Sequence, residues 1–250
     1  MFHVEHFSMM KNFRNSLFID IETASGEEAF ANLSENMQRL WLRKARSLMN
    51  PSQKPLQELY FERAALFPEF GRIISIGMGF LYYNKNKELS LKVKTISHEN
   101  EKDLLIEFSQ FIEQNYPSKE LSLVAHNGKE FDFPYLCKRM LVHQLVIPKA
   151  LQLQGKKPWE VVHQDTIEWW RFGDKKGYVS LELLAEIMGI QNVKTDLSGD
   201  RVNHTFYMEK DLEKIKKYCA EDVITLAQLF LRFNFVDYIK EENIQRVMDN

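Results

Sequence analysis

The chain has 250 residues, of which 44% are hydrophobic and 27% charged, and its formal net charge is -2. These values exclude a disordered, fibrous or collagen-like chain, and the length allows one domain with a sizeable core. The apolar runs are too short to cross a bilayer, so we expect a cytoplasmic protein without a membrane partner. The near-neutral charge alone does not indicate a polyanionic ligand.

The first predicted elements are β-strands that follow a tail. Residues 1–14 show no periodicity and are expected to form a flexible N-terminal tail. Alternating apolar residues predict a strand at Leu17–Thr23, and a helical stripe predicts a helical insertion at about 27–67. Two further strands, Arg72–Tyr83 and Glu88–Ser97, are separated by a polar turn and therefore predict a hairpin.

The rest of the chain alternates between helices and strands. Helices are predicted at Glu101–Asn115, Phe131–Leu145, Ser180–Met188 and Asp211–Phe233, and strands at Leu121–Asn127 and Glu160–Thr166. This order predicts an α/β fold with a mixed five-stranded sheet flanked by helices. We expect residues 15–250 to form a single domain that carries the helical insertion.

Two carboxylates lie near the end of the first predicted strand. Asp20 and Glu22 are two residues apart, so they project from the same face at a spacing of about 6.5 Å. Taken alone, the pair is better explained as a solvated acidic face of a strand.

The last predicted helix places another carboxylate on an apolar stripe. Asp222 recurs with Ile215, Tyr218 and Leu226 at steps of three or four residues. Burying an ionised carboxylate costs several kcal/mol unless it has a partner, so Asp222 requires one. Glu221, one position away, points elsewhere and is expected to be solvated.

Asp132 lies in the first turn of its predicted helix, directly after a strand. An aspartate at this position is often only a helix cap or a partner of the helix dipole, and that alternative stays open. No lysine or arginine adjoins Asp20, Glu22 or Asp222 in the sequence, so a divalent cation is the simplest partner for the acids. Carboxylates favour Mg²⁺ or Mn²⁺, and two such ions about 3.5 to 4 Å apart would promote phosphodiester hydrolysis.

Three segments resemble the motifs of a known family. They are Phe18-Ile19-Asp20-Ile21-Glu22-Thr23, His126-Asn127-Gly128-Lys129-Glu130-Phe131-Asp132 and Tyr218-Cys219-Ala220-Glu221-Asp222. In this order they resemble the three motifs of the DEDDy 3′-5′ exonucleases, which have an RNase H-like fold. The middle segment is most similar to the exonuclease domain of B-family DNA polymerases. The whole chain resembles stand-alone bacterial exonucleases related to that domain.

The resemblance implies a role for each acid. Asp20, Glu22 and Asp222 would hold the catalytic ion, and Asp20 would also bridge to a second ion that Asp132 contacts through water. Tyr218 would orient the attacking water, with a core aromatic as the alternative. The implied cofactors are therefore two Mg²⁺ or Mn²⁺ ions.

The resemblance also implies contacts with the substrate. Asn127 would lie near the terminal nucleotide, with Phe131 as its flanking aromatic residue and Thr23 as a further contact. A satisfied turn for Asn127 and a core position for Phe131 are the alternatives. The segment 24–26 departs from the small and apolar residues that many relatives place against the terminal base.

The implied reaction removes nucleotides from the 3′ end of single-stranded nucleic acid, expected to be DNA, and releases nucleoside 5′-monophosphates. A proofreading role would require a separate polymerase or repair partner. One alternative is a 3′-5′ exoribonuclease like RNase D, because the sequence does not show whether a 2′-hydroxyl is accommodated. The other is a nucleic-acid-binding domain without catalytic activity.

Other polar and aromatic residues have simpler explanations. Asp165 is expected to cap the turn that carries Trp169 and Trp170. These tryptophans could stack on bases, but core burial is the better explanation for at least one of them. His126 is expected to end a strand rather than bind metal, and the two cysteines are expected to be reduced core residues.

Overall fold

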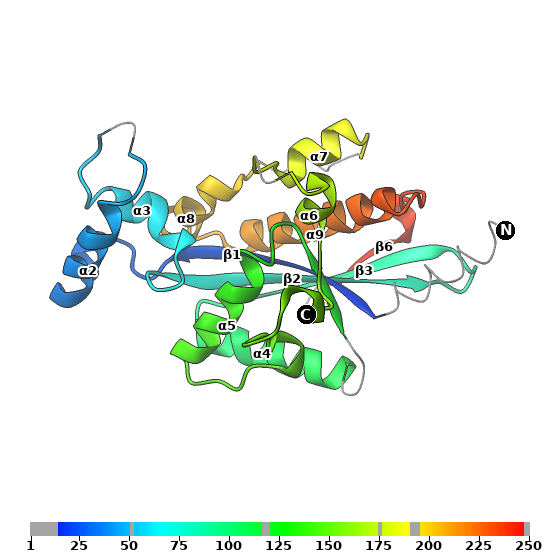
Figure 1. Cartoon of the computed structure of the whole chain (residues 1–250), viewed down its shortest axis with the longest axis horizontal. Coiled ribbons are helices and arrows are strands. Elements are labelled where there is room, and N and C mark those ends of the chain that lie inside the picture. The colour runs from blue at the N-terminus through cyan, green and yellow to red at the C-terminus, as the bar shows by residue number, and fades with distance from the viewer. Residues whose placement is uncertain (1–14, 51–52, 117–120, 175–176, 191–195, 248–250) are drawn as a thin grey trace.

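A mixed β-sheet forms the centre of the protein (Figure 1). The structure is a computed structural model that describes residues 15–50, 53–116, 121–174, 177–190 and 196–247, so the expected tail lies outside the described residues. The described strands are arranged in the order β5-β4-β1-β2-β3-β6. Their bounds are β1 Ser16–Ser25, β2 Gly71–Tyr83, β3 Leu89–Ser97, β4 Ser122–Ala125, β5 Gln164–Asp165 and β6 Ile244–Val247.

Strand β1 is central and is covered on both faces. It runs antiparallel to β2 and pairs in parallel with β4. Leu17 and Ile19 contact one hydrophobic cluster, whereas Phe18 contacts another, and all three side chains are fully buried. Side chains on either face of β1 are therefore largely removed from water, including polar ones.

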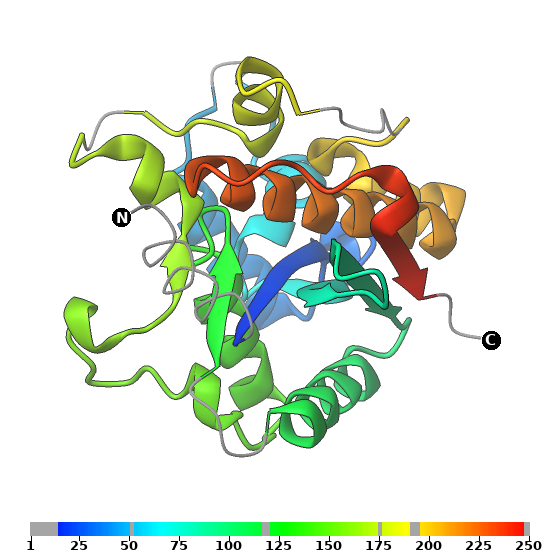
Figure 2. The ribbon, with the colours of Figure 1, turned by 90° about the vertical axis from the view of Figure 1, so that its right-hand side faces the viewer.

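Helices form a layer on each face of the sheet (Figure 2). The helices α4 (Glu101–Asn115) and α5 (Asp132–Val142) pack on one face. The long helix α9 (Leu212–Phe233) lies across the other face, and α6 (Thr166–Arg171) and α7 (Leu181–Ile187) pack against it. Phe18 belongs to the same hydrophobic cluster as residues of α9, so its side chain faces that helix. Because side chains alternate along a strand, the residues two and four positions after Phe18 face α9 as well.

The helical insertion between β1 and β2 has a small core of its own. It contains α2 (Glu35–Ala45) and α3 (Leu59–Arg63). The ring of Trp41 packs edge-on against Tyr60 and Phe70, with a centroid separation of 5.2 Å in both cases. The insertion extends from one end of the sheet (Figure 1).

The predicted α/β fold with a mixed sheet and flanking helices is confirmed. The structure adds β6, which pairs in parallel with β3, and it shortens the predicted strand at Glu160–Thr166 to the two residues of β5. In β6 the apolar residues Ile244 and Val247 are three positions apart, so the segment lacks the alternation that indicates a strand. Among the described residues, no helix is long and apolar enough to cross a membrane.

Gly77 on β2 allows α9 to approach the sheet closely. It lies opposite Asp20 in the antiparallel register of β1 and β2. A Cβ atom at Gly77 would lie 2.6 Å from Cγ2 of Val223 and 2.9 Å from Sγ of Cys219, both on α9. A side chain at this position would therefore displace the helix from β1.

We expect Gly77→Ala to lower the free energy of unfolding by about 1–3 kcal/mol, because the added methyl group overpacks the contact with α9. Val223→Ala removes one of the atoms that the methyl group would meet, so the double variant should lose less than the sum of the two single losses. Urea denaturation of the four proteins measures these values. Additive losses would mean that α9 is not pressed against the sheet at Gly77.

Candidate active site

Two carboxylates of β1 face α9. Asp20 and Glu22 share the α9 side of the strand with Phe18, because side chains alternate along a strand. Glu22 is only 7% exposed, and Asp20 is half-buried. The register between β1 and β2 shifts directly after Glu22. Irregularities of this kind change the direction of neighbouring side chains and are frequent beside active sites.

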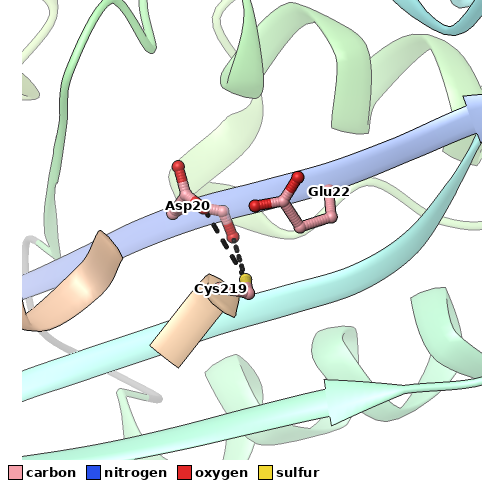
Figure 3. Close-up of side chains that lie close together, drawn as sticks. All are labelled: Asp20, Glu22 and Cys219. Carbon is pink, nitrogen blue, oxygen red and sulfur yellow. Dashed lines mark hydrogen bonds between the residues drawn. The ribbon is translucent and has the colours of Figure 1, made fainter. Parts of the chain in front are cut away.

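Helix α9 adds a thiol to this pair (Figure 3). The Sγ atom of Cys219 lies 3.6 Å from Oδ2 of Asp20 and 3.7 Å from its carbonyl oxygen. One potential ligand atom from each of Asp20, Glu22 and Cys219 can be chosen so that all three lie within 4.8 Å of one another. The close approach of α9 at Gly77 thus brings the helix into direct contact with Asp20.

Asp132 joins the site from the first turn of α5. Its side chain is 4% exposed, and its Oδ1 accepts a hydrogen bond from the backbone N–H of Ile21 at 3.1 Å. The recorded pairing between β1 and β4 ends at Phe18 and Val124, so the carboxylate replaces a missing strand partner beyond that point. Asp132 is therefore fixed beside the segment of β1 that carries Asp20 and Glu22.

The carboxylates lie in a desolvated and negatively charged environment. Burial raises the pKa of Asp20 well above its usual range, and the charges of Asp222 and Asp132 raise it further. Burial also raises the pKa of Glu22, to which the charges of Asp20, Asp222 and Asp132 add. Burial raises the pKa of Asp132 to about 7 and that of Asp222 to about 6. A bound cation would offset this repulsion and favour the ionised forms.

The donor atoms suit a hard divalent cation. Carboxylate oxygens are the ligands that Mg²⁺ and Mn²⁺ prefer, and Asp20, Glu22, Asp132 and Asp222 supply them from three elements of the fold. Cys219 is fully buried, and burial followed by the charge of Asp20 raises the pKa of its thiol. The thiol therefore stays protonated and is better suited to donate a hydrogen bond to Asp20 than to bind a hard ion.

Tyr218 lies one turn before Asp222 on α9 and forms a hydrogen bond with its carboxylate. Burial raises the pKa of Tyr218, and the charges of Asp222 and Glu22 raise it further. The phenol is therefore protonated and donates its hydrogen to Asp222. A Cβ atom added to Gly199 would lie 3.9 Å from the hydroxyl oxygen of Tyr218. The backbone at Gly199 therefore borders the site.

The turn after β4 holds Asn127 in a fixed conformation. Asn127 has a φ of 65°, and its backbone N–H donates to Oδ1 of Asp165 at 2.8 Å. The N–H of Lys129 donates to the other oxygen of Asp165 at 3.0 Å. Gly128 is required here, because a Cβ atom would overlap the side chain of Ala125. Within the described residues, Oδ1 of Asn127 is buried and has no hydrogen-bond partner.

The other two predicted substrate contacts lie against α5. The ring of Phe131 packs on that of Tyr135, with centroids 5.3 Å apart. Thr23 is 9% exposed, and its side chain forms a hydrogen bond with Tyr135. The structure thus places both residues beside Tyr135, and their contact with a substrate stays a prediction.

The residues with simpler explanations pack within the protein, although Trp169, Trp170 and Cys137 are only half-buried. Asp165 caps α6 by accepting the backbone N–H of Ile167 at 3.1 Å. Trp169 packs on Phe230 at a centroid distance of 5.2 Å, and Trp170 stacks on Phe233 at 6.5 Å. The tryptophans therefore attach α6 to α9. Both cysteines are free thiols.

Several neighbours of the carboxylates were not predicted from the sequence. They include the contact between Cys219 and Asp20, the backbone at Gly199, and Tyr178. Asp165 was predicted to be a cap in preference to a further polar contact, and its carboxylate also holds the turn at Asn127. The three-residue spacing from Cys219 to Asp222 was a usable signal, because it places the thiol on the same side of the helix. The positions of Gly199 and Tyr178 depend on contacts between segments that are far apart in the sequence, and no local sequence pattern indicates such contacts.

The raised pKa values of Asp132 and Asp222 predict a pH dependence of the metal-free protein. Between about pH 4 and pH 7, the folded protein retains protons that the unfolded chain has released, so the free energy of unfolding decreases as pH rises through this window. Asp132→Asn keeps an oxygen that can accept from Ile21 and removes one titrating group. We therefore expect this variant to lose less stability than the wild-type protein between about pH 4 and pH 7.

Chemical denaturation in the presence of a chelator measures this difference. Glu186→Gln is the matched control, because Glu186 is exposed on α7 and should leave the pH dependence unchanged. Equal pH dependence in the wild-type protein and Asp132→Asn would contradict the expected burial of a titrating carboxylate.

Comparisons with known proteins give the fold and the family of the chain. No curated protein matches the chain. Among solved structures, the fold is similar to the family B DNA polymerase from the hyperthermophilic archaeon Pyrobaculum calidifontis, with a TM-score of 0.52 and 15% sequence identity. The match covers 87% of this chain and 24% of the polymerase chain, so this chain spans about a quarter of that protein's length. A family model matches residues 66–249, and the chain therefore belongs to the predicted 3′-5′ exonucleases related to the exonuclease domain of PolB.

Proposed function

We propose that the protein is a DEDDy-type 3′-5′ exonuclease that removes nucleotides from the 3′ end of single-stranded DNA and releases nucleoside 5′-monophosphates. The observation that carries this proposal is the group of desolvated carboxylates from β1, α5 and α9, in which the charges of Asp222 and Asp132 raise the pKa values of Asp20 and Glu22. Such a group favours a cation over a purely structural role. The family to which the chain belongs adds independent support.

Asp20, Glu22 and Asp222 would hold one Mg²⁺ or Mn²⁺ ion, and Asp20 with Asp132 would hold a second. When bound, such ions supply electrostatic stabilisation of the attacking and leaving oxygens of a phosphodiester. The hydrogen bond from Ile21 fixes the orientation of Asp132. Cys219 fixes Asp20 in a similar way through its thiol.

Tyr218 is proposed to orient the attacking water. Because its hydroxyl donates to Asp222, its oxygen is free to accept a hydrogen bond from a water molecule. Its raised pKa keeps the phenol neutral, so Tyr218 aligns the water rather than removing its proton. The unpaired Oδ1 of Asn127 is proposed to accept a hydrogen bond from the substrate near its 3′ end.

Cleavage of matched oligonucleotides tests the proposed reaction. A single-stranded DNA labelled at its 5′ end should shorten one nucleotide at a time with Mg²⁺ or Mn²⁺, and the released product should be a nucleoside 5′-monophosphate. RNA of the same sequence should be cleaved more slowly. Faster cleavage of RNA would favour an RNase D-like exoribonuclease, and intact 3′ ends on both substrates would favour binding without catalysis.

Replacing Asp20 by Ala is expected to abolish cleavage and to leave the metal-free fold intact, because it removes one of several carboxylates that repel each other. Glu221→Ala is the matched control. Glu221 is adjacent to Asp222 on α9 but pairs with Arg246 at 2.8 Å, so cleavage should persist. Cleavage rates together with thermal unfolding under chelator decide the outcome. Unfolding of the metal-free Asp20→Ala protein at a normal assay temperature would count against a cation site.

Tyr218→Phe is expected to lower the turnover number by about 10- to 1,000-fold with little change in substrate binding, because the ring remains and only the hydroxyl is lost. Tyr207→Phe controls for the loss of a buried hydroxyl, since Tyr207 donates to the carbonyl of Ser25 at 2.6 Å. Single-turnover cleavage at saturating enzyme measures both rates. An unchanged rate in Tyr218→Phe would mean that another group orients the attacking water.

A further inference from the structure

His126 follows β4, which is the parallel neighbour of β1. Strands β1 and β4 are parallel neighbours, and Phe18 pairs with Val124. His126 directly follows Ala125, the last residue of β4, and precedes Asn127 in the turn after that strand. It therefore lies beyond the paired part of β1 and β4, in the same chain direction as Asp20.

His126 anchors a segment that arrives from a distant part of the chain. Its Nε2 contacts the carbonyl oxygen of Val179 at 2.7 Å, and its Nδ1 contacts the hydroxyl of Thr166 at 2.9 Å. Burial lowers the pKa of His126, so the ring is neutral and Nε2 donates to the carbonyl. Both ring nitrogens thus have protein partners, which agrees with a structural role for His126.

The anchored segment carries an exposed aromatic side chain. Tyr178 precedes Val179, and its ring lies 6.3 Å from that of His126 in an edge-on arrangement. Its side chain is nevertheless 65% exposed. The contact with His126 therefore holds the ring at one side and leaves much of it accessible.

The electrostatic environment of this segment agrees with a place beside the carboxylates. Burial raises the pKa of the Tyr178 phenol, and the charges of Asp132, Asp20 and Asp222 raise it further. The charge of Glu182, on the first turn of α7, raises the pKa of Asp222. Two residues of this segment are thus near enough to the carboxylates to interact with their charges. The segment continues into α7, which packs on α9.

We propose that Tyr178 is a substrate-contacting residue, on which a nucleobase at the 3′ end of a single strand stacks while the terminal phosphodiester lies over the carboxylates. This inference rests on the proposed exonuclease function and adds a specificity-determining residue to it. An exposed aromatic ring accepts any base, because every base has a π-face, so the contact selects an unpaired end rather than a sequence. A paired terminal base keeps its own stacking partners and must leave them before it can reach Tyr178.

The test compares Tyr178→Ala and Tyr178→Phe on single-stranded DNA. The alanine variant should raise KM by about 5- to 150-fold, the range that one stacked base contributes, and change kcat much less. The phenylalanine variant keeps the ring and should stay within about twofold of the wild-type protein. Tyr238→Ala is the matched control, since Tyr238 is 60% exposed and belongs, with Ile239 and Lys240, to the segment that follows α9. It should leave KM unchanged.

A substrate with an abasic 3′-terminal nucleoside separates stacking from a structural effect. On this substrate the difference between the wild-type protein and Tyr178→Ala should disappear, because the group that stacks is absent. An equal difference on both substrates, or an unchanged KM in Tyr178→Ala, would overturn the proposal.

Failure of the proposed function has a different signature. If the wild-type protein cleaves no oligonucleotide, the exonuclease proposal fails, and titration of a fluorescent single strand still tests Tyr178 through the dissociation constant. A dissociation constant that rises in Tyr178→Ala but not in Tyr238→Ala would support the contact without catalysis. Equal dissociation constants in all variants would overturn it.

Discussion

The close packing of α9 against β1 and β2 is the contact on which the candidate site depends. Gly77 leaves no side chain between the helix and the sheet, so Cys219 can contact Asp20 directly. One turn further, the same helix carries Asp222, and Tyr218 donates to it. A methyl group at Gly77 would displace α9 and move these residues away from β1. The packing between α9 and the sheet therefore sets the geometry of the polar site.

The opposite side of the site is built from hydrogen bonds rather than from close packing. Beyond the recorded pairing of β1 with β4, Asp132 accepts the N–H of Ile21. The carboxylate of Asp165 holds the turn at Asn127, and His126 holds the segment at Val179. These bonds replace the strand pairing that the sheet lacks at this point. The gap between two parallel strands is thus where polar side chains from several loops can meet.

Much of the fold could be predicted from the sequence, and the four acids were singled out there as candidates. Alternating residues identified β1, and the three- and four-residue steps identified α9, on which Asp222 is half-buried. The approach of Cys219 could not be predicted, because it depends on Gly77, which is far away in the sequence. Likewise, the position of Tyr178 could not be predicted, because it depends on the contacts of Tyr178 and Val179 with His126, which is far away in the sequence. Local periodicity records which face a residue takes, but not which distant segment covers that face.

Grouping desolvated carboxylates at the candidate site lowers the stability of the metal-free protein. Asp20 and Glu22 lie on a strand covered on both faces, so their charges are desolvated and repel each other without a cation. The apolar clusters around Phe18 and Leu17 must offset that repulsion in the metal-free protein. Because the surrounding sheet and helices are already ordered, a cation would meet carboxylates that cannot move apart. The rigid surroundings keep the carboxylates close together, which is unfavourable in the metal-free protein. The same rigidity would therefore strengthen the binding of a cation, which would offset their repulsion.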